Sequence, residues 1–383
     1  MSESEPIRVG VLFSQTGDIS LIETSQLMGT LFAIEEINES GGINGRELVP
    51  VRYDPASSPG LYRVLAERLV LQDKINVIFG CYKSSTRKSV IPVIEKWNRL
   101  LFYPTLYEGF ECSSNIIYTG AAPNQNSVQL AEFMTSNYGA RVYMVGSDYI
   151  YPYESNRIMT DLVMQKPGGD KVGERYVSLN ATMSDFASII ADIKNVQPDF
   201  IFSTVVGNST QYLYKAYAEA GLNPREMPIA SLTTLEAEVA QMGFDVAAGH
   251  VASAPYFQSI DSPVNRSSLA NFRRRFGTDV VPSAGWEAAY FQVHLFANAM
   301  RLSGSDAIDA LMPCLLGAQL DAPQGRIQID PSNHHTCLYP RIGIANDEGQ
   351  FTLVRQAIRP VHPDPYLVTH SLGDWTIKLG GME

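Results

Sequence analysis

The chain has 383 residues, with 40 acidic side chains against 29 lysines and arginines, which gives a formal net charge of −11. This length suits two domains or one large one, and a hydrophobic share of 45% is ordinary for a globular protein. The acidic balance, without a run rich in lysine and arginine, argues against nucleic acid as a direct ligand. No apolar run approaches the roughly 20 residues that a membrane-spanning helix needs.

The first residues and the cysteines bear on the compartment. Met1–Pro6 is acidic and leads directly into the apolar run Ile7–Phe13, whereas a secretory signal starts basic and ends at a small-residue cleavage site. Four widely spaced cysteines form neither a disulfide framework nor a zinc motif. They are Cys81, Cys112, Cys314 and Cys337. We therefore expect a cytoplasmic protein; the alternative is a periplasmic protein whose signal peptide was removed.

Strand-like and helical patterns alternate from the amino terminus onward. The β-branched run Arg8–Ser14 precedes Ser20–Asn38, where apolar residues recur at helical spacing until Gly41–Gly45 ends the helix. Strands alternating with helices predict βαβ units and a parallel sheet covered on both faces. Further strands are expected at Leu48–Tyr53, Ile75–Gly80, Leu101–Tyr103, Val142–Gly146, Phe200–Val206, Ile229–Leu232 and Val251–Ala254, and further helices at Leu61–Leu71 and in a stretch that closes with Glu95–Leu100.

The alternation runs past the length of one sheet, so the sequence predicts an α/β fold of two doubly wound lobes with parallel-sheet cores. No low-complexity linker separates them, which indicates several short crossings, with the proline-containing Ala121–Pro123 and Ser253–Pro255 as candidate hinges. We expect lobe 1 to comprise residues 1–121 and 255–326, lobe 2 to comprise 122–254 and 327–383, and a ligand cleft to lie between them. The tail from Arg326 is predicted to form short antiparallel pieces, with turns at Asp347–Gly349 and Pro360–Asp364.

The loops that follow the predicted strands carry hydroxyls and tyrosines. Open α/β sheets bind ligands beyond the carboxyl ends of their strands, so these loops are the expected site. They are Phe79–Thr86, Leu101–Tyr107, Gly146–Pro152 and Phe202–Gly207. Ser84 and Ser85 stand at an expected helix start, where free backbone N–H groups favour an acceptor oxygen, although a serine there is often only a helix cap. Hydroxyls among aromatic walls, without a fixed charge, suit a small neutral polar molecule.

Catalytic and metal-binding alternatives have weaker support. Cys81 with Lys83, or Ser84 and Ser85 near Lys88, would suit an amide hydrolase only if a base lies within hydrogen-bond reach of the nucleophile. His334 and His335, as neighbours on a strand, would point to opposite faces. Gly41–Gly45 is not a dinucleotide fingerprint, and there is no P-loop. We expect no enzyme activity, no cofactor and no metal.

A series of runs, in order over nearly the whole chain, resembles the amide- and urea-binding branch of type I periplasmic-binding-protein-like receptors. The likeness is strongest to the cytoplasmic amide sensors that negatively regulate aliphatic amidase operons. The ending Pro363–Trp375 is more similar to those sensors than to transporter receptors. The matching runs are GVLFSQTG (Gly10–Gly17), IEEINESGGINGR (Ile34–Arg46), FGCYKSSTRKSVIPVIE (Phe79–Glu95), YPTLYEGFE (Tyr103–Glu111), APNQNS (Ala122–Ser127), GSDYIYPYESN (Gly146–Asn156), FSTVVG (Phe202–Gly207), IASLTTLEAEVA (Ile229–Ala240), APYFQSID (Ala254–Asp261) and DAPQG (Asp321–Gly325).

The resemblance implies a Venus-flytrap protein that closes on a short neutral amide such as acetamide, or on urea, formamide or butyramide. It further implies an RNA-binding antiterminator as partner, held inactive until the amide arrives, and a homo-oligomer such as a dimer. Ser84 matches the serine that hydrogen-bonds the amide. Ser85 and Leu106 depart from the sensor pattern beside the pocket, which leaves the preferred amide chain length open. The other matched site positions are Tyr82, Tyr103, Thr105, Tyr149, Tyr151, Thr204, Val206 and Thr233.

Three hypotheses follow from the sequence. The first is an amide-responsive negative regulator that acts by sequestering its antiterminator partner. The second is the solute-binding receptor of an ABC importer for urea or short amides. The third, an amide hydrolase, would need sustained ammonia release from acetamide that is abolished by Cys81→Ala or Ser84→Ala.

Overall fold

The computed structural model describes residues 5–368, and these residues form two compact units. Unit 1 comprises residues 5–106, Glu111–Gly120 and Ser262–Cys337; unit 2 comprises Tyr107–Phe110, Ala121–Asp261 and residues 338–368. The main crossings fall after Gly120, Asp261 and Cys337. The sequence prediction placed the last two at 254/255, from the proline of Ser253–Pro255, and at 326/327, near the expected start of the antiparallel tail. The structure keeps Pro255 in unit 2, where its carbonyl accepts a hydrogen bond from Arg341.

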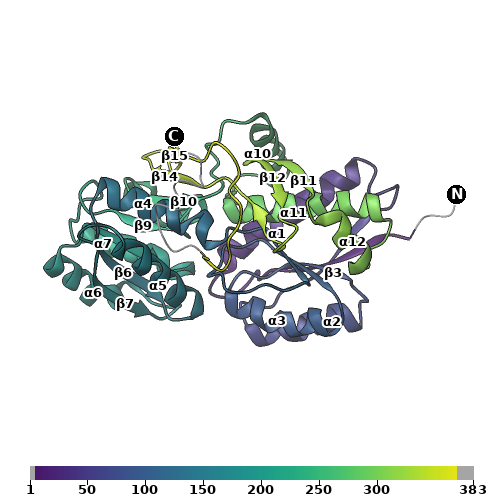
Figure 1. Cartoon of the computed structure of the whole chain (residues 1–383), viewed down its shortest axis with the longest axis horizontal. Coiled ribbons are helices and arrows are strands. Elements are labelled where there is room, and N and C mark those ends of the chain that lie inside the picture. Colours follow the sequence, from purple (N-terminus) through teal and green to yellow (C-terminus); the bar gives the residue numbers. More distant parts are fainter. Residues whose placement is uncertain (1–4, 369–383) are drawn as a thin grey trace. The chain divides into compact units, whose positions relative to one another are not determined.

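Unit 1 is built on a five-stranded parallel sheet of order β2-β1-β3-β4-β5. Helix α1 crosses from β1 to β2 on one face, while α2 and α3 pack together on the other (Figure 1). β3 is buried along its whole length, as expected for a strand with helices on both sides. The elements are β1 Ile7–Leu12, α1 Ser20–Glu39, β2 Leu48–Tyr53, α2 Pro59–Leu71, β3 Val77–Gly80, α3 Ser84–Lys96, β4 Leu100–Tyr103 and β5 Ile116–Tyr118.

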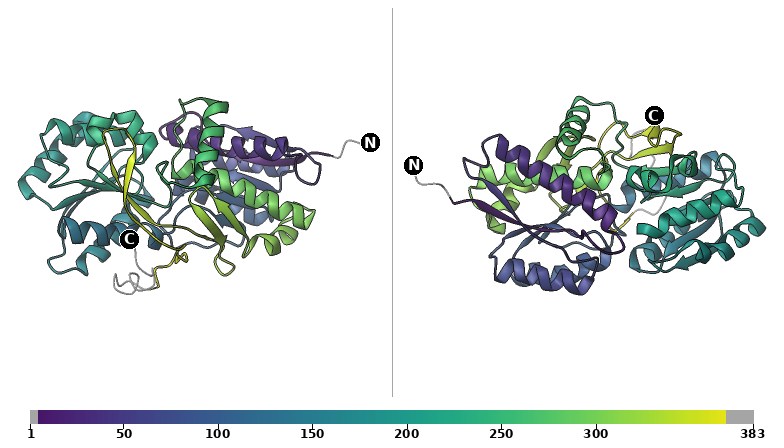
Figure 2. Two further views of the ribbon diagram at one scale, coloured as in Figure 1. Left: turned by 90° about the horizontal axis from the view of Figure 1, so that it is seen from above. Right: turned by 180° about the vertical axis from the view of Figure 1, so that it is seen from behind.

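The later part of unit 1 covers the same sheet and adds a small one. Helix α11 packs along α1, as the view from behind in Figure 2 shows. This close packing requires glycine at position 29. A Cβ atom there would lie only 2.5 Å from the Trp286 carbonyl oxygen and would clash with it. Strands β11, β12 and β13 form a three-stranded antiparallel sheet. The elements are α10 Pro263–Phe276, α11 Ala284–Ser303, α12 Ile308–Leu315, β11 Gln319–Ala322, β12 Gly325–Ile329 and β13 Thr336–Cys337.

Unit 2 contains a seven-stranded sheet of order β15-β14-β10-β9-β8-β6-β7, in which the last five are parallel. Helices α4 and α5 pack together, as do α6 and α7. The elements are α4 Ser127–Asn137, β6 Arg141–Ser147, α5 Ile150–Met164, β7 Asp170–Val177, α6 Met183–Val196, β8 Phe200–Thr204, α7 Thr210–Glu219, β9 Ile229–Ser231, α8 Glu236–Met242, α9 Phe244–Ala247, β10 Val251–Ala254, β14 Arg341–Ala345 and β15 Phe351–Gln356. Short 3₁₀ turns occupy Pro123–Gln125 and Gly207–Ser209.

The predicted fold class, an α/β protein with two parallel-sheet cores, is confirmed. The antiparallel tail is also confirmed, and the turn at Asp347–Gly349 joins β14 to β15. The turn predicted at Pro360–Asp364 is not found at these residues. Val361 instead makes an antiparallel bridge with Leu338. Within residues 5–368, no helix is both long enough and apolar enough to cross a membrane.

Candidate functional site

The five candidate residues of unit 1 lie at the carboxyl ends of two neighbouring parallel strands. β3 pairs with β4 in the register Val77 to Leu100, so the loops after both strands leave the same edge of the sheet. Tyr82, Ser84 and Ser85 follow β3, whereas Tyr103 ends β4 and Thr105 follows it. The sheet therefore brings these residues together, although they come from two stretches of the chain.

Ser84 is the first residue of α3, and the residue that caps the helix is Lys83. Ser84 is buried, whereas Ser85 is half-buried. The interpretation of Ser84 as a helix cap is therefore wrong in this structure, because the cap position falls one residue earlier. Its side chain lies at the positive end of the helix dipole, a location that favours partial negative charge such as that of a carbonyl oxygen.

Hydrogen bonds fix the other unit 1 candidates. The Tyr103 hydroxyl donates to the Tyr82 carbonyl oxygen at 2.6 Å. The Thr105 hydroxyl accepts a hydrogen bond from Gln26 Nε2 at 2.9 Å. The same hydroxyl donates to the Cys81 carbonyl oxygen at 3.3 Å. These bonds tie the β4 loop to the β3 loop and give the edge a defined shape.

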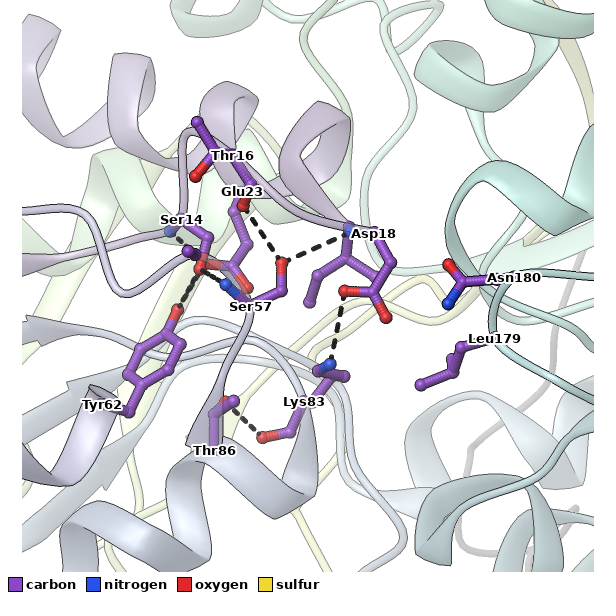
Figure 3. Close-up of polar contacts among 12 residues, drawn as sticks. Ser14, Thr16, Asp18, Glu23, Ser57, Tyr62, Lys83, Thr86, Leu179 and Asn180 are labelled. Carbon is purple, nitrogen blue, oxygen red and sulfur yellow. Dashed lines mark hydrogen bonds and ion pairs between the residues drawn. The ribbon is translucent and has the colours of Figure 1, made fainter. Parts of the chain in front are cut away.

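A buried polar network supports this edge from the first strand. The Glu23 carboxylate accepts from the Ser14 backbone N–H and from the Tyr62 hydroxyl, and the Ser14 hydroxyl lies 3.3 Å from that of Tyr62 (Figure 3). Burial raises the pKa of Glu23 to about 7, although hydrogen bonds from Tyr62 and Ser14 and the charge of Lys83 act against that rise. Lys83 itself forms an ion pair with Asp18, with Nζ 3.6 Å from the carboxylate oxygen (Figure 3).

The buried guanidinium of Arg87 contacts Ser84 and the Tyr103 ring. The Arg87 side chain is fully buried and pairs with Glu111 through Nε to Oε1 at 2.7 Å and Nη2 to Oε2 at 3.3 Å. The positive charges of Arg87 and Lys88 lower the pKa of Glu111, against the effect of its burial. Sequence reasoning missed this pair. The signal for Arg87 was its position three residues after Ser84, which places both on one helix face.

The five candidates of unit 2 follow three neighbouring parallel strands. Tyr149 and Tyr151 come after β6, Thr204 and Val206 end or follow β8, and Thr233 follows β9. Val206 was predicted to end a strand, but β8 stops at Thr204 and Val206 lies in the turn beyond it. The structure thus brings this second set together at one edge of its own sheet.

Neutral hydrogen bonds hold the unit 2 set. The Thr204 hydroxyl donates to Asn156 Oδ1 at 2.9 Å, and the Val206 N–H donates to the Ser147 hydroxyl at 3.2 Å. The Thr233 N–H donates to the Ser231 hydroxyl at 3.1 Å. Tyr149 and Tyr151 lie close, with ring centroids 6.2 Å apart. Asn156 and Ser147 are supporting residues that the sequence prediction did not include.

Two buried carboxyls follow the same unit 2 edge. Burial raises the pKa of Glu236 to about 8 and that of Glu238 to about 7. One Glu236 oxygen accepts from the Gln258 N–H at 2.7 Å, and one Glu238 oxygen accepts from the Leu235 N–H at 2.9 Å. Glu236 is therefore mostly protonated and Glu238 about half protonated near neutral pH, so this part of the edge carries less negative charge than two ordinary carboxylates would.

The geometry gives the hydrolase alternatives little support. Burial raises the pKa of the Cys81 thiol well above its usual value, which disfavours the reactive thiolate. The two lysines that would act as bases are in ion pairs, Lys83 with Asp18 and Lys88 with Glu111, the latter at 3.1 Å.

The two adjacent histidines precede β13 and differ in backbone conformation. His334 lies in a bend with a left-handed φ of 62°, whereas His335 makes a parallel β-bridge with Tyr118, so only His335 has the expected strand-like pairing. The His335 ring stacks on Tyr118 with centroids 4.1 Å apart, and burial lowers its pKa to about 4. The His335 ring therefore has a packing role in unit 1.

Comparison with known proteins defines the class of this two-unit α/β protein as a ligand-binding receptor. The model of the periplasmic binding protein domain matches residues 7–372. The chain belongs to this family. Its similarity to a leucine-, isoleucine-, valine-, threonine- and alanine-binding protein of Pseudomonas aeruginosa is 24% identity over 335 residues, covering 85% of this chain and 86% of that protein.

A solved structure and a partial relative complete the comparison. A solute-binding protein of an ABC transporter from Rhodopseudomonas palustris, in complex with 3,4-dihydroxybenzoic acid, superposes with a TM-score of 0.82 at 22% identity, covering 91% of this chain and 95% of that one. A protein named limonene hydroxylase from Geobacillus stearothermophilus is 34% identical over 133 residues. That match covers 35% of this chain and spans only 24% of the hydroxylase's own length. The full-length similarities are therefore to binding proteins.

Proposed function

We propose that this protein is a receptor for a short neutral amide or urea, and that it serves as the solute-binding component of an ABC importer. The observation that carries the ligand class is the chemistry of the ten candidate residues, which offer hydroxyls, phenol rings and one valine but no charged side chain. Each of the two edges offers this chemistry by itself. The importer role is supported by family membership and by the transport-associated relatives.

The charges next to these residues favour a neutral ligand. The buried Lys83 is paired with Asp18, and the buried Arg87 with Glu111, which Lys88 also contacts from an exposed position. A benzoate or an amino acid would bring a carboxylate, whose removal from water needs an opposite charge that is not already compensated. An amide brings one acceptor and two donors without net charge, which hydroxyl groups can satisfy.

A ligand panel tests this proposal. Titration calorimetry with acetamide, formamide, butyramide and urea should give binding heats, whereas isoleucine and 4-hydroxybenzoate should give none at the same concentrations. Binding of isoleucine or the benzoate in preference to every amide would overturn the ligand class. Acetamidine is an informative addition, because it has nearly the shape of acetamide but carries N–H groups in place of the carbonyl oxygen and should be rejected.

A second candidate role is negative regulation, in which the protein sequesters an RNA-binding antiterminator until an amide releases it. It is favoured by the resemblance of the runs quoted above to amide sensors. Part of the ending that supports it, Pro363–Trp375, lies outside the described residues. Purification from the native cell, with and without acetamide, separates the roles. Recovery in the periplasmic fraction supports the importer role, whereas acetamide-sensitive co-purification with an antiterminator supports the sensor role.

A further inference from the structure

Arg87 joins two candidate ligand residues of unit 1 through one planar side chain. Its Nη1 atom lies 3.5 Å from the Ser84 hydroxyl oxygen, and its guanidinium carbon lies 4.7 Å from the centroid of the Tyr103 ring. The Arg87 side chain has no exposed surface. A fully buried guanidinium is costly to desolvate, so its position requires specific partners.

Glu111 supplies the partner that holds this guanidinium in one orientation. The two ion-pair contacts, from Nε and from Nη2, form the forked geometry that only arginine offers to a carboxylate. The Tyr118 hydroxyl also donates to Glu111, at 3.0 Å, and fixes the carboxylate from β5. Lys88 contacts the outer oxygen of Glu111 from a half-exposed position.

The direction of the Ser84 contact has a chemical consequence. A guanidinium has donors and no acceptor, so the Ser84 oxygen is the acceptor in its contact with Arg87. This contact orients the serine hydroxyl and increases its strength as a donor to another acceptor. Arg87 also covers the face of the Tyr103 ring, whose hydroxyl holds the Tyr82 carbonyl. Three of the five unit 1 candidates are thereby connected to one guanidinium.

We propose that Arg87, oriented by Glu111, is the positioning residue of the unit 1 edge, and that it sets Ser84 as a hydrogen-bond donor to a carbonyl oxygen of the ligand. This inference rests on the proposed function for its ligand. The positioning itself is a property of the protein without ligand. Arg87 acts through Ser84 and Tyr103 and is not itself expected to contact the ligand.

A double-mutant cycle tests the proposal, with acetamide as the probe in titration calorimetry. Arg87→Lys keeps the charge but loses the two-bond contact with Glu111 and the planar guanidinium that lies over the Tyr103 ring. The dissociation constant for acetamide should therefore rise about tenfold. In a Ser84→Ala background the same change should raise it by less than about threefold, because the residue through which Arg87 acts has been removed. Lys88→Ala is the control, since it removes the other cation on Glu111 and should change affinity by less than about twofold.

Equal losses in both backgrounds, or unchanged affinity in a folded Arg87→Lys protein, would overturn the proposal. Glu111→Asp is the second variant, for use if Arg87→Lys does not fold, because it shortens the carboxylate and moves the guanidinium while keeping both charges. It should reproduce the affinity loss and its dependence on Ser84.

Amide hydrogen exchange keeps this inference separate from the proposed function. In the protein without ligand, Arg87→Lys should speed exchange in the segments containing Ser84 and Tyr103, while α2 keeps its wild-type rates. Unchanged exchange in these segments would overturn the positioning role. If the wild-type protein binds no amide and no urea, the proposed ligand class fails, and the exchange result still decides the role of Arg87.

Discussion

In unit 1 the residues around Ser84 are fixed by charged groups, the pairs Arg87–Glu111 and Lys83–Asp18, and by the buried carboxyl of Glu23. In unit 2 the hydrogen bonds that hold Thr204, Val206 and Thr233 are neutral, and the titratable Glu236 and Glu238 accept instead from the backbone N–H groups of Gln258 and Leu235. Both arrangements leave a hydroxyl-rich edge. They differ in their sensitivity, because charged and titratable supports respond to pH and to the loss of one partner more strongly than neutral hydrogen bonds do.

The largest pH effect expected in unit 1 comes from its buried carboxyl, Glu23. The pKa of Glu23 is about 7 in the folded protein against an ordinary value of 4.5. Glu23 therefore keeps its proton to a higher pH in the folded protein than in the unfolded chain. Its contribution to the free energy of unfolding is fully present below pH 4.5 and is lost as the pH rises through 7. The loss is on the order of 3 kcal/mol.

Glu23→Gln should remove that dependence, because the amide resembles the protonated carboxyl but does not titrate. Between about pH 5 and pH 8 the wild-type protein should lose stability, whereas the variant should not. The difference in the free energy of unfolding, variant minus wild type, should therefore rise over this range by the amount that the wild type loses. Guanidinium chloride unfolding at both pH values measures this, and urea is avoided because it is a candidate ligand. A stability difference that is the same at both pH values would contradict the raised pKa of Glu23.

The next effect concerns binding at the same edge. Ser84→Ala should weaken acetamide binding by roughly 1–3 kcal/mol, because a buried polar atom of the ligand loses its partner. Ser89→Ala is the matched control, since this serine lies on the same helix and its hydroxyl bonds to the Thr86 carbonyl at 2.7 Å. Calorimetry should show control affinity close to wild type. Unchanged affinity in Ser84→Ala would refute the assignment of this residue.

Pattern reasoning predicted the sheet cores well because buried parallel strands such as β3 are short, continuous apolar runs. It missed β7, an edge strand that is mostly polar and partly exposed, and β5, which has only three residues. β7 lacks the apolar run that marks the buried strands, whereas β5 is apolar and buried but has too few residues to form a pattern. The strand-end loops were predictable as well, since the carboxyl edge of a parallel sheet is where open α/β proteins bind ligands.

The supports of the site were not predictable in the same way. Arg87 and Glu111 are 24 residues apart, and their pairing depends on a loop that no periodic pattern describes. The same holds for Thr204 and Asn156, which are 48 residues apart. Such contacts come from tertiary packing, so the sequence could show the hydroxyl-bearing residues at the strand ends but not those that hold them in place.

The smallest expected effect concerns the neutral hydrogen bond between Thr204 and Asn156 in unit 2. Thr204→Val keeps the shape of the side chain and removes the hydrogen bond to Asn156, so the free energy of unfolding should fall by about 1 kcal/mol. Because neither group titrates, the loss should be the same at about pH 5 and pH 8. Thr160→Val is the control, since its hydroxyl donates to the Asn156 carbonyl of its own helix at 2.8 Å and lies 3.5 Å from Met144 Sδ, and neither contact involves a titrating group. A pH-dependent loss in Thr204→Val would mean that a titrating group, such as the buried Glu236, is coupled to this edge, and the contrast between a charged and a neutral support would then fail.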